Sequence, residues 1–338
     1  MNVLLTGGSG FLGGHVALTL REAGHHVALL VRRPESVADL GEGWEIVRGD
    51  LLDPASVERA VAGREAVVHL AGMVKRWTRD RTLFDQVNVG GTLRLIEAAL
   101  REGVPRILYC SSFFALGPTD GRTAGDETLA HDGRPRNDYE RTKLAAELEV
   151  RALQDRGLPI VILYPGIVYG PGRMTEGNLL ATVARDLLAG RLPGTIGPGD
   201  RPQCLAWAED VAAGFASALE RAEPGSRYIL GGENLTVREA LEIIAAAGGV
   251  RPPRRVIPYG IARLIGHAYL LRARLFGIPP ALTPDEVEIY GHDWAYDSSR
   301  ACRELGYRIT PAREGLERMV RWLIDEGHVP RRPRTGDD

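Results

Sequence analysis

The chain has 338 residues, of which 44% are hydrophobic and 25% charged, which is ordinary for a globular protein with a sizeable core. Its 42 basic and 44 acidic residues give a net charge of −2 without a basic stripe, which argues against nucleic acid as a partner. Three widely spaced cysteines, Cys110, Cys204 and Cys302, match no zinc-binding pattern, so we expect no metal site and a reducing compartment. The first residues lead into a strand rather than a signal peptide, and the cytoplasm is therefore the expected location.

Short apolar runs alternate with helical stretches from the start of the chain. Runs that are apolar on both faces and separated by helices are typical of a parallel sheet covered on both sides. The sequence therefore predicts an α/β fold of the doubly wound Rossmann type. The expected strands cover 2–6, 26–31, 44–48, 66–70, 106–110 and 159–163, and the expected helices cover 13–22, 53–61, 86–102 and 138–156.

The pattern changes after residue 163, where turn-rich stretches separate short helices. We expect an NAD(P)-binding Rossmann domain over 1–165, to which 211–230 returns to complete the sheet. A smaller C-terminal α/β substrate lobe would then comprise 166–210 and 231–330. The polar residues 331–338 are expected to form a disordered tail.

The segment 259–276 is the most apolar of the second half, and its apolar residues follow helical spacing. Arg263, His267, Arg272 and Arg274 interrupt it, so we expect no transmembrane segment. The favoured interpretation is a helix packed on its own lobe. A mobile lid or an interfacial amphipathic surface is the alternative.

Glycines occupy positions 7, 8, 10 and 13 in the string TGGSGFLG, which follows a predicted strand and opens a predicted helix. Glycine is needed where the backbone turns sharply and approaches a pyrophosphate at a helix N-terminus. The position of the string in a βαβ unit predicts a dinucleotide site rather than a plain tight turn.

The second strand ends in Val31-Arg32-Arg33, where an acidic residue would bind the ribose hydroxyls of NAD. A guanidinium attracts the 2′-phosphate of NADP and can bind it in a bidentate manner. NADP is therefore the preferred cofactor and NAD the alternative. The two arginines could also be ordinary solvated side chains.

Tyr139 and Lys143 are four residues apart on a predicted helix and therefore share one face. A free phenol has a pKa of about 10, and a neighbouring ammonium and an oxidised nicotinamide are expected to favour the phenolate. Tyr139 then becomes a usable acid or base. Of the 42 basic residues only Lys75 and Lys143 are lysines, which indicates that a compact ammonium is required at position 143.

Ser112 follows a predicted strand at the sheet edge where such folds bind ligands, and its hydroxyl could donate to a substrate carbonyl. Asn88 enters the next helix near the same edge and could anchor a water or a backbone carbonyl behind Lys143. As an ordinary helix residue it would need no such role.

Nine segments together resemble the extended short-chain dehydrogenase/reductase family, also known as the NAD-dependent epimerase/dehydratase superfamily. They are TGGSGFLG, GDLLD, HLAG, VNVGGT, SSFFALG, YERTK, YPGIVYGPG, WAEDVA and RYILGGENLT. The resemblance implies that Ser112, Tyr139, Lys143 and Asn88 are catalytic. It further implies cofactor contacts from Gly7, Gly10, Phe11, Leu12, Gly13, Arg32, Arg33, Asp50, Leu51, Leu70, Ala71, Gly72, Tyr139, Lys143, Pro165, Gly166 and Val168.

Departures from the family pattern guide the choice of subgroup. Phe113 and Phe114 stand where sugar dehydratases carry an Asp-Glu pair, and Gln203 stands where nucleotide-sugar epimerases usually carry arginine. Arg201 is only two residues away, which leaves a diphosphate site open. The chain looks most similar to the dihydroflavonol-4-reductase-like and hopanoid-associated epimerase-like branch.

These observations favour NADP-dependent reduction of a ketone or aldehyde to an alcohol, with Tyr139 as the general acid. A nucleotide-sugar epimerase that retains NAD is the second hypothesis. The third is a protein that senses NADP without catalysis, against which the Ser-Tyr-Lys set argues. We expect a small-molecule carbonyl or sugar substrate and a monomer or homodimer.

Overall fold

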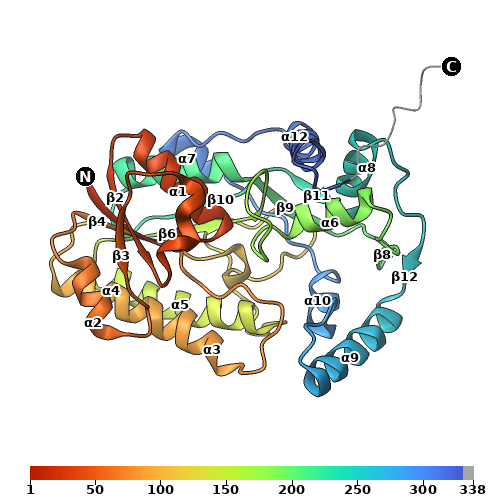
Figure 1. Ribbon diagram of the computed structural model, residues 1–338, viewed down its shortest axis with the longest axis horizontal. Coiled ribbons are helices and arrows are strands. Elements are labelled where there is room, and N and C mark those ends of the chain that lie inside the picture. The colour runs from red at the N-terminus through yellow and green to blue at the C-terminus, as the bar shows by residue number, and fades with distance from the viewer. Residues whose placement is uncertain (330–338) are drawn as a thin grey trace.

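The computed structural model describes residues 1–329 (Figure 1). Its centre is a parallel seven-stranded sheet in the order β10-β6-β5-β4-β1-β2-β3. The chain winds outward from β1 in one direction and from β4 in the other, so a ligand crevice is expected between the carboxyl ends of these two strands. The strands are β1 (Asn2–Thr6), β2 (His26–Val31), β3 (Glu45–Arg48), β4 (Ala66–His69), β5 (Ile107–Cys110), β6 (Ile160–Pro165) and β10 (Arg227–Leu230).

Helices cover both faces of the sheet because the strands are apolar on both sides. Alternate residues of β1 show this division, since Val3 and Leu5 pack on one face and Leu4 packs on the other. The predicted doubly wound α/β fold is therefore confirmed. One face carries α1 (Phe11–Glu22), α7 (Ala208–Arg221) and α11 (Ser299–Leu305), and the other carries α2 (Pro54–Val61), α4 (Thr92–Arg101) and α5 (Asp138–Asp155).

The helix expected over 86–102 is longer and is divided into three parts. It begins with α3 (Thr82–Phe84), continues as the π-helical turn η2 (Asp85–Gly91), and ends as α4. A π-helical turn inside a helix is often found at a functional site, and η2 contains Asn88. Short 3₁₀ turns, η1 (Pro34–Leu40) and η3 (Phe113–Ala115), follow β2 and β5.

After β6 the chain leaves the main sheet and builds a second layer, and it returns with α7 and β10. A three-stranded sheet and a two-stranded sheet lie here beside helices that form a separate apolar core. The predicted tail, 331–338, lies outside the described residues. The elements of this part are β7 (Ile167–Tyr169), α6 (Leu179–Leu188), β8 (Thr195–Ile196), β9 (Pro202–Trp207), β11 (Asn234–Thr236), α8 (Val237–Ala247), β12 (Val256–Ile257) and α12 (Ala312–Asp325).

The helix predicted over 259–276 is α9 (Tyr259–Phe276), which packs against α10 (Pro284–Ile289) at the periphery (Figure 1). Its buried positions are the small residues Ala262, Gly266 and Ala273. The helix thus packs on its own lobe as expected, but it does so through these small residues, and its large apolar side chains are exposed. No helix among residues 1–329 is both long and apolar enough to cross a membrane.

Candidate active site

The glycine turn between β1 and α1 is held by close backbone contacts. Gly7 has a φ of +82°, and a Cβ atom there would lie 2.6 Å from the Ala71 nitrogen. A Cβ atom at Gly13 would lie 2.0 Å from the Gly7 carbonyl oxygen, which also accepts a bond from the Gly10 nitrogen at 2.8 Å. Side chains are therefore excluded, and the free amides of the α1 N-terminus face the turn, which fits a dinucleotide pyrophosphate.

A buried hydrogen-bond network fixes the segment after β4 against this turn. The Thr6 hydroxyl oxygen accepts from the Ala71 nitrogen at 3.1 Å and lies 2.6 Å from His69 Nδ1. His69 Nε2 lies 2.9 Å from the Thr92 hydroxyl, which donates to the Asn88 carbonyl at 2.7 Å. Because each hydroxyl has one proton, the network requires the proton of His69 on Nε2. Sequence reasoning gave Thr6, His69 and Thr92 no role.

Burial keeps His69 neutral. Desolvation lowers its pKa from 6.5 to about 3, and the positive charge of Lys143 acts in the same direction. The neutral ring is the form that the two threonine hydroxyls require. His69 therefore positions Leu70, Ala71 and Gly72, the predicted dinucleotide contacts, without touching the reaction itself.

The predicted adenosine contacts lie at the ends of β2 and β3. Asp50 Oδ1 accepts from the Leu52 nitrogen at 3.0 Å, which shapes the turn after β3, and Leu51 is buried. Arg32 and Arg33 are exposed directly after β2. Among residues 1–329, no hydrogen bond or ion pair involves the side chain of either arginine, so both guanidinium groups are available to an anion.

Helix α5 carries Tyr139 and Lys143 toward the crevice. The Asn137 side chain caps the helix by accepting from the Glu140 nitrogen at 2.8 Å, which fixes the first turn. Lys143 is 5% exposed, and its Nζ donates to the Cys110 carbonyl at 2.8 Å. The same Nζ lies 6.0 Å from the centroid of the Tyr139 ring. Both side chains therefore face the end of β5 rather than bulk water.

Ser112 lies between the end of β5 and η3, which packs against α5. Its Oγ accepts from the Phe114 nitrogen at 3.3 Å, so it acts as the N-cap of η3. The cap does not use the hydroxyl proton, which can be donated to one acceptor, either the phenol oxygen of Tyr139 or a substrate oxygen. Ser112 is buried, and a hydrogen bond with its hydroxyl opposes the effect of burial on the pKa of Tyr139.

Gly72 and Asn88 connect this set to the dinucleotide crevice. A Cβ atom at Gly72 would lie 3.4 Å from Asn88 Oδ1 and 3.7 Å from Lys143 Nζ. The Asn88 amide pairs with the backbone of Met73, accepting from its nitrogen at 2.6 Å and donating to its carbonyl at 3.1 Å. It also donates to the Thr142 hydroxyl at 3.0 Å. Asn88 thus anchors a backbone carbonyl, that of Met73.

The expectation that an ammonium and an oxidised nicotinamide favour the phenolate of Tyr139 concerns the complex with the cofactor and stays a prediction. In the protein alone, other groups set the pKa of Tyr139. Burial raises it above the usual value, the neighbouring Cys110 thiol adds to the shift, and the Ser112 hydroxyl opposes it. Burial also lowers the pKa of Lys143, while Cys110 and Glu147 act in the other direction. Burial therefore favours the neutral phenol of Tyr139 over the phenolate.

An aromatic cluster, Phe113, Phe114, Trp294 and Tyr296, meets the ring of Tyr139 through Phe114. The Phe114 ring meets the Tyr139 ring edge to face at 5.9 Å and the Trp294 ring at 4.7 Å. Trp294 is fully buried, and Tyr296 donates to the Phe113 carbonyl at 3.2 Å. The wall of the site next to Tyr139 is therefore apolar. Trp294 and Tyr296 lie far from Tyr139 in the sequence, and no local motif predicted that they belong to the site.

A second missed residue, Arg173, lies over the glycine turn. Its guanidinium donates to the carbonyls of Gly8 at 2.7 Å and Gly10 at 3.2 Å, and it pairs with Asp39. The charge on Asp39 is stabilised, because the hydrogen bond from Arg173 lowers its pKa. Arg173 thus holds the chain after β7 against the glycine turn.

The predicted nicotinamide contacts lie where the main sheet meets the second layer. A Cβ atom at Gly166 would lie 2.6 Å from the Cys204 carbonyl oxygen, so the backbones approach closely there. Val168 in β7 is partly buried against the same core as Leu12 and Leu70. Pro165 ends β6. These residues extend the crevice from the glycine turn toward the second layer.

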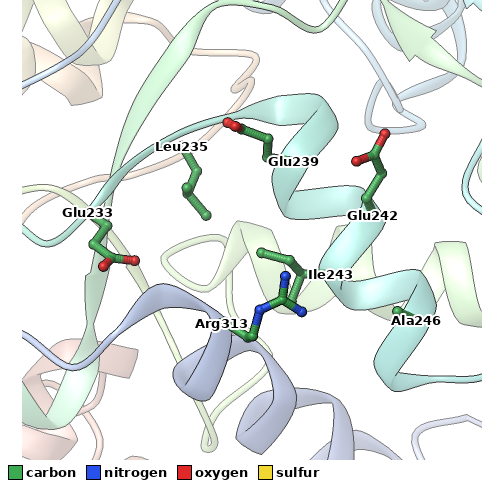
Figure 2. A pocket seen from close by; sticks show the side chains of 7 residues that line it. All are labelled: Glu233, Leu235, Glu239, Glu242, Ile243, Ala246 and Arg313. Atoms are coloured by element: carbon green, nitrogen blue, oxygen red, sulfur yellow. The ribbon is translucent and has the colours of Figure 1, made fainter.

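Two hollows lie in the second layer. An apolar one of about 80 Å³ has Ile167, Gln203 and Tyr290 in its wall and adjoins the predicted nicotinamide segment. The other, of about 380 Å³, opens between α8 and α12, where Arg313 points toward Ile243 (Figure 2). Its lining contains none of the predicted site residues and consists of Glu233, Leu235, Glu239, Glu242, Ile243, Ala246 and Arg313.

This combination of a doubly wound sheet, a glycine turn and a paired phenol and ammonium defines an NAD(P)-dependent enzyme. The sequence model of the NAD dependent epimerase/dehydratase family matches residues 3–231. The chain therefore belongs to that family, which comprises the extended short-chain dehydrogenases/reductases.

Relatives of this chain include reductases and epimerases. Sterol demethylase protein B of Methylococcus capsulatus is 32% identical over 97% of this chain and 100% of its own. The 2-alkyl-3-oxoalkanoate reductase of Stenotrophomonas maltophilia is 32% identical over 94% of this chain and 98% of its own. The UDP-glucose 4-epimerase of Thermus thermophilus, solved in complex with NAD, is 28% identical over 97% of this chain and 100% of its own. The TM-score between the two structures is 0.74.

Proposed function

We propose that this protein reduces a ketone or aldehyde on an apolar substrate, using NADP, with Tyr139 as the general acid. The observation that carries the proposal is the position of Tyr139 between the buried Lys143 and the ring of Phe114. Burial raises the pKa of Tyr139, so the phenol holds its proton at neutral pH. A reductase needs this protonated form to complete the alcohol.

When bound, the reduced dinucleotide supplies a hydride to the carbonyl carbon. Ser112 donates its hydroxyl proton in a hydrogen bond to the carbonyl oxygen, which stabilises the negative charge that develops there. Tyr139 transfers its phenolic proton to that oxygen, which completes the alcohol. Lys143, held by the Cys110 carbonyl, is placed to bind ribose hydroxyls and to stabilise the phenolate that remains.

The lining of the site favours an apolar substrate. Phe114, backed by the buried Trp294, lies beside Tyr139, and the apolar hollow beside Ile167 lies next to the predicted nicotinamide segment. Gln203 is buried there, while Arg201 is directed to an ion pair with Asp293 at 3.2 Å. The expected arginine for a sugar diphosphate is therefore missing from position 203. A relative named for reduction of 2-alkyl-3-oxoalkanoates agrees with this preference.

The preference for NADP rests on Arg32 and Arg33. Both are exposed directly after β2, and neither side chain has a partner within residues 1–329. No acidic side chain occupies the end of β2, since Val31 stands there. A 2′-phosphate would thus meet two free guanidinium groups without a competing carboxylate.

The direct experiment is a carbonyl panel assayed with NADPH and NADH. It contains cyclic ketones, alkyl-substituted 3-oxoacids, aldehydes and, for comparison, UDP-glucose. We expect NADPH oxidation with apolar ketones and a lower KM for NADPH than for NADH. Absence of turnover with every carbonyl compound, together with interconversion of UDP-glucose and its epimer, would overturn the proposal.

The similarity to a UDP-glucose 4-epimerase solved with NAD supports a second candidate, a sugar epimerase that retains its cofactor. Such an enzyme must keep the same dinucleotide through an oxidation and a reduction. Denaturing the purified protein and quantifying the released nucleotide distinguishes the two candidates. A reductase releases little nucleotide, whereas an epimerase releases nearly one equivalent of NAD.

A further inference from the structure

Helix α9 exposes an unusual number of large apolar side chains. Leu264 is 70% exposed, Leu271 is 59% exposed and Leu275 is 65% exposed. At 100° per residue, these three positions lie opposite Ala262 and Gly266, which are buried against the rest of the protein. The apolar face of the helix is thus directed away from the protein. Ile261 and Phe276 extend it toward either end of the helix.

The same region is strongly basic. Residues 243–284 contain six arginines and no aspartate or glutamate, although the whole chain has a net charge of −2. Within the part of the chain that the structure describes, five of these arginines make no ion pair, while Arg263 pairs with Glu288. These five arginines therefore keep their charge without an ion-pair partner, although α10, which packs against α9, adds Asp285, Glu286 and Glu288 beside it. The five are Arg251, Arg254, Arg255, Arg272 and Arg274.

Helix α9 is held by α10, which is itself bonded to the body of the protein. Arg76, in the segment after β4, pairs with Glu286 of α10 at 2.5 Å and donates to the Ala281 carbonyl at 2.8 Å. Tyr259 donates from the start of α9 to the Tyr290 carbonyl at 3.0 Å. These bonds argue against a freely moving lid. They hold the apolar face of α9 in one orientation. Arg76 belongs to the segment after β4, whose first residues are the predicted cofactor contacts Leu70, Ala71 and Gly72.

We infer that α9 is a docking surface for an anionic lipid bilayer, with its leucine face in the headgroup region. Arginines flanking an apolar helix face can bury their methylene stems and direct their charge to lipid phosphates. A second copy of this chain fits less well. Two-fold symmetry would place the same patch on both partners, so unpaired arginines would face each other.

This binding is independent of the proposed carbonyl reduction and is tested by vesicle flotation. The full-length protein is mixed with vesicles of phosphatidylcholine alone, or with phosphatidylglycerol as one lipid in three. We expect binding to be at least about tenfold stronger on the anionic vesicles and to weaken as salt is raised. No flotation, or equal flotation on both compositions, would overturn the inference.

Two double variants separate the apolar from the electrostatic contribution. Leu264→Ser/Leu271→Ser and Arg272→Glu/Arg274→Glu should each lower binding by at least about fivefold. The matched controls are Leu148→Ser/Ile309→Ser and Arg59→Glu/Arg308→Glu, which change exposed residues elsewhere. Equal loss in the controls would contradict the assignment.

Two further measurements test for self-association and for damage to the active site. Sedimentation velocity without lipid should give the same oligomeric state for the wild type and the Leu264→Ser/Leu271→Ser variant. A dimer that becomes monomeric in this variant would instead assign the face to a second copy. Reduction of a water-soluble ketone should stay at the wild-type rate in all four variants, because these residues lie outside the candidate active site.

Discussion

The ammonium of Lys143 donates a hydrogen bond to the carbonyl oxygen of Cys110 across 2.8 Å, and this bond joins α5 to the end of β5. Ser112 lies two residues beyond that carbonyl, and Tyr139 lies one helical turn before the lysine. One buried contact therefore brings the serine, the phenol and the ammonium to the same edge of the sheet.

Lys143→Met should reduce activity without reducing stability. Burial lowers the pKa of Lys143, so the charged form at neutral pH carries a desolvation cost that methionine does not. We expect kcat for ketone reduction to fall about 100-fold while the melting temperature stays level or rises. Assays and calorimetry on the same preparation check both quantities. An equally large fall in the melting temperature would mean that the lysine is mainly structural.

Gly13→Ala should abolish dinucleotide binding. The added Cβ atom would lie 2.0 Å from the Gly7 carbonyl oxygen, which forces the turn to open. Gly260→Ala is a matched control, because it lies in the first turn of α9 and its Cβ atom would have nothing within 4 Å. Titration of protein fluorescence with NADPH should show binding only for the control and the wild type. Unchanged affinity in Gly13→Ala would place the cofactor elsewhere.

Arg32→Glu should reverse the cofactor preference. The substitution replaces an exposed, unpaired guanidinium with a carboxylate that repels a 2′-phosphate. We expect the KM for NADPH to rise at least about tenfold and the KM for NADH to stay level or fall. Arg59→Glu controls for the change in net charge. If both KM values change in parallel, the arginine does not recognise the phosphate.

His69→Gln should make stability less sensitive to acid. The pKa of His69 is lowered from 6.5 to about 3, so between these values the unfolded chain binds a proton that the folded protein does not. The contribution of neutral His69 to the free energy of unfolding is therefore complete above pH 6.5. It is lost as the pH falls from 6.5 toward about 3. Between pH 7 and pH 5 the wild type should lose about 2 kcal/mol more than the variant. Urea unfolding at both pH values measures this difference, and identical losses would show that His69 does not titrate in this way.

Much of the fold follows from local patterns in the sequence. Strands that are apolar on both faces and separated by helices predicted the parallel sheet, because only such a sheet buries both faces of its strands. The glycine spacing marked the turn between β1 and α1, and the spacing of Tyr139 and Lys143 placed both on one face of α5. These features depend on residues that are close in sequence.

The features that the sequence did not reveal depend on long-range contacts. The rings of Trp294 and Phe114 are in contact although the two residues lie far apart in the sequence. Arg173, which follows β7, donates a hydrogen bond to the carbonyl of Gly10 near the start of the chain. No periodicity links such positions. The burial that raises the pKa of Tyr139 likewise depends on how the whole chain packs around the phenol. Spacing likewise identified the apolar face of α9 but not the direction in which it points.

Proton donation by Tyr139 is central to the proposed reaction, and Tyr139→Phe tests it most directly. Phenylalanine keeps the ring beside Phe114 and removes only the hydroxyl. With the best ketone of the panel and saturating NADPH, we expect the single-turnover rate to fall at least about 100-fold, with NADPH affinity and melting temperature unchanged. A variant that reduces the ketone at the wild-type rate would contradict the assignment of Tyr139 as the general acid.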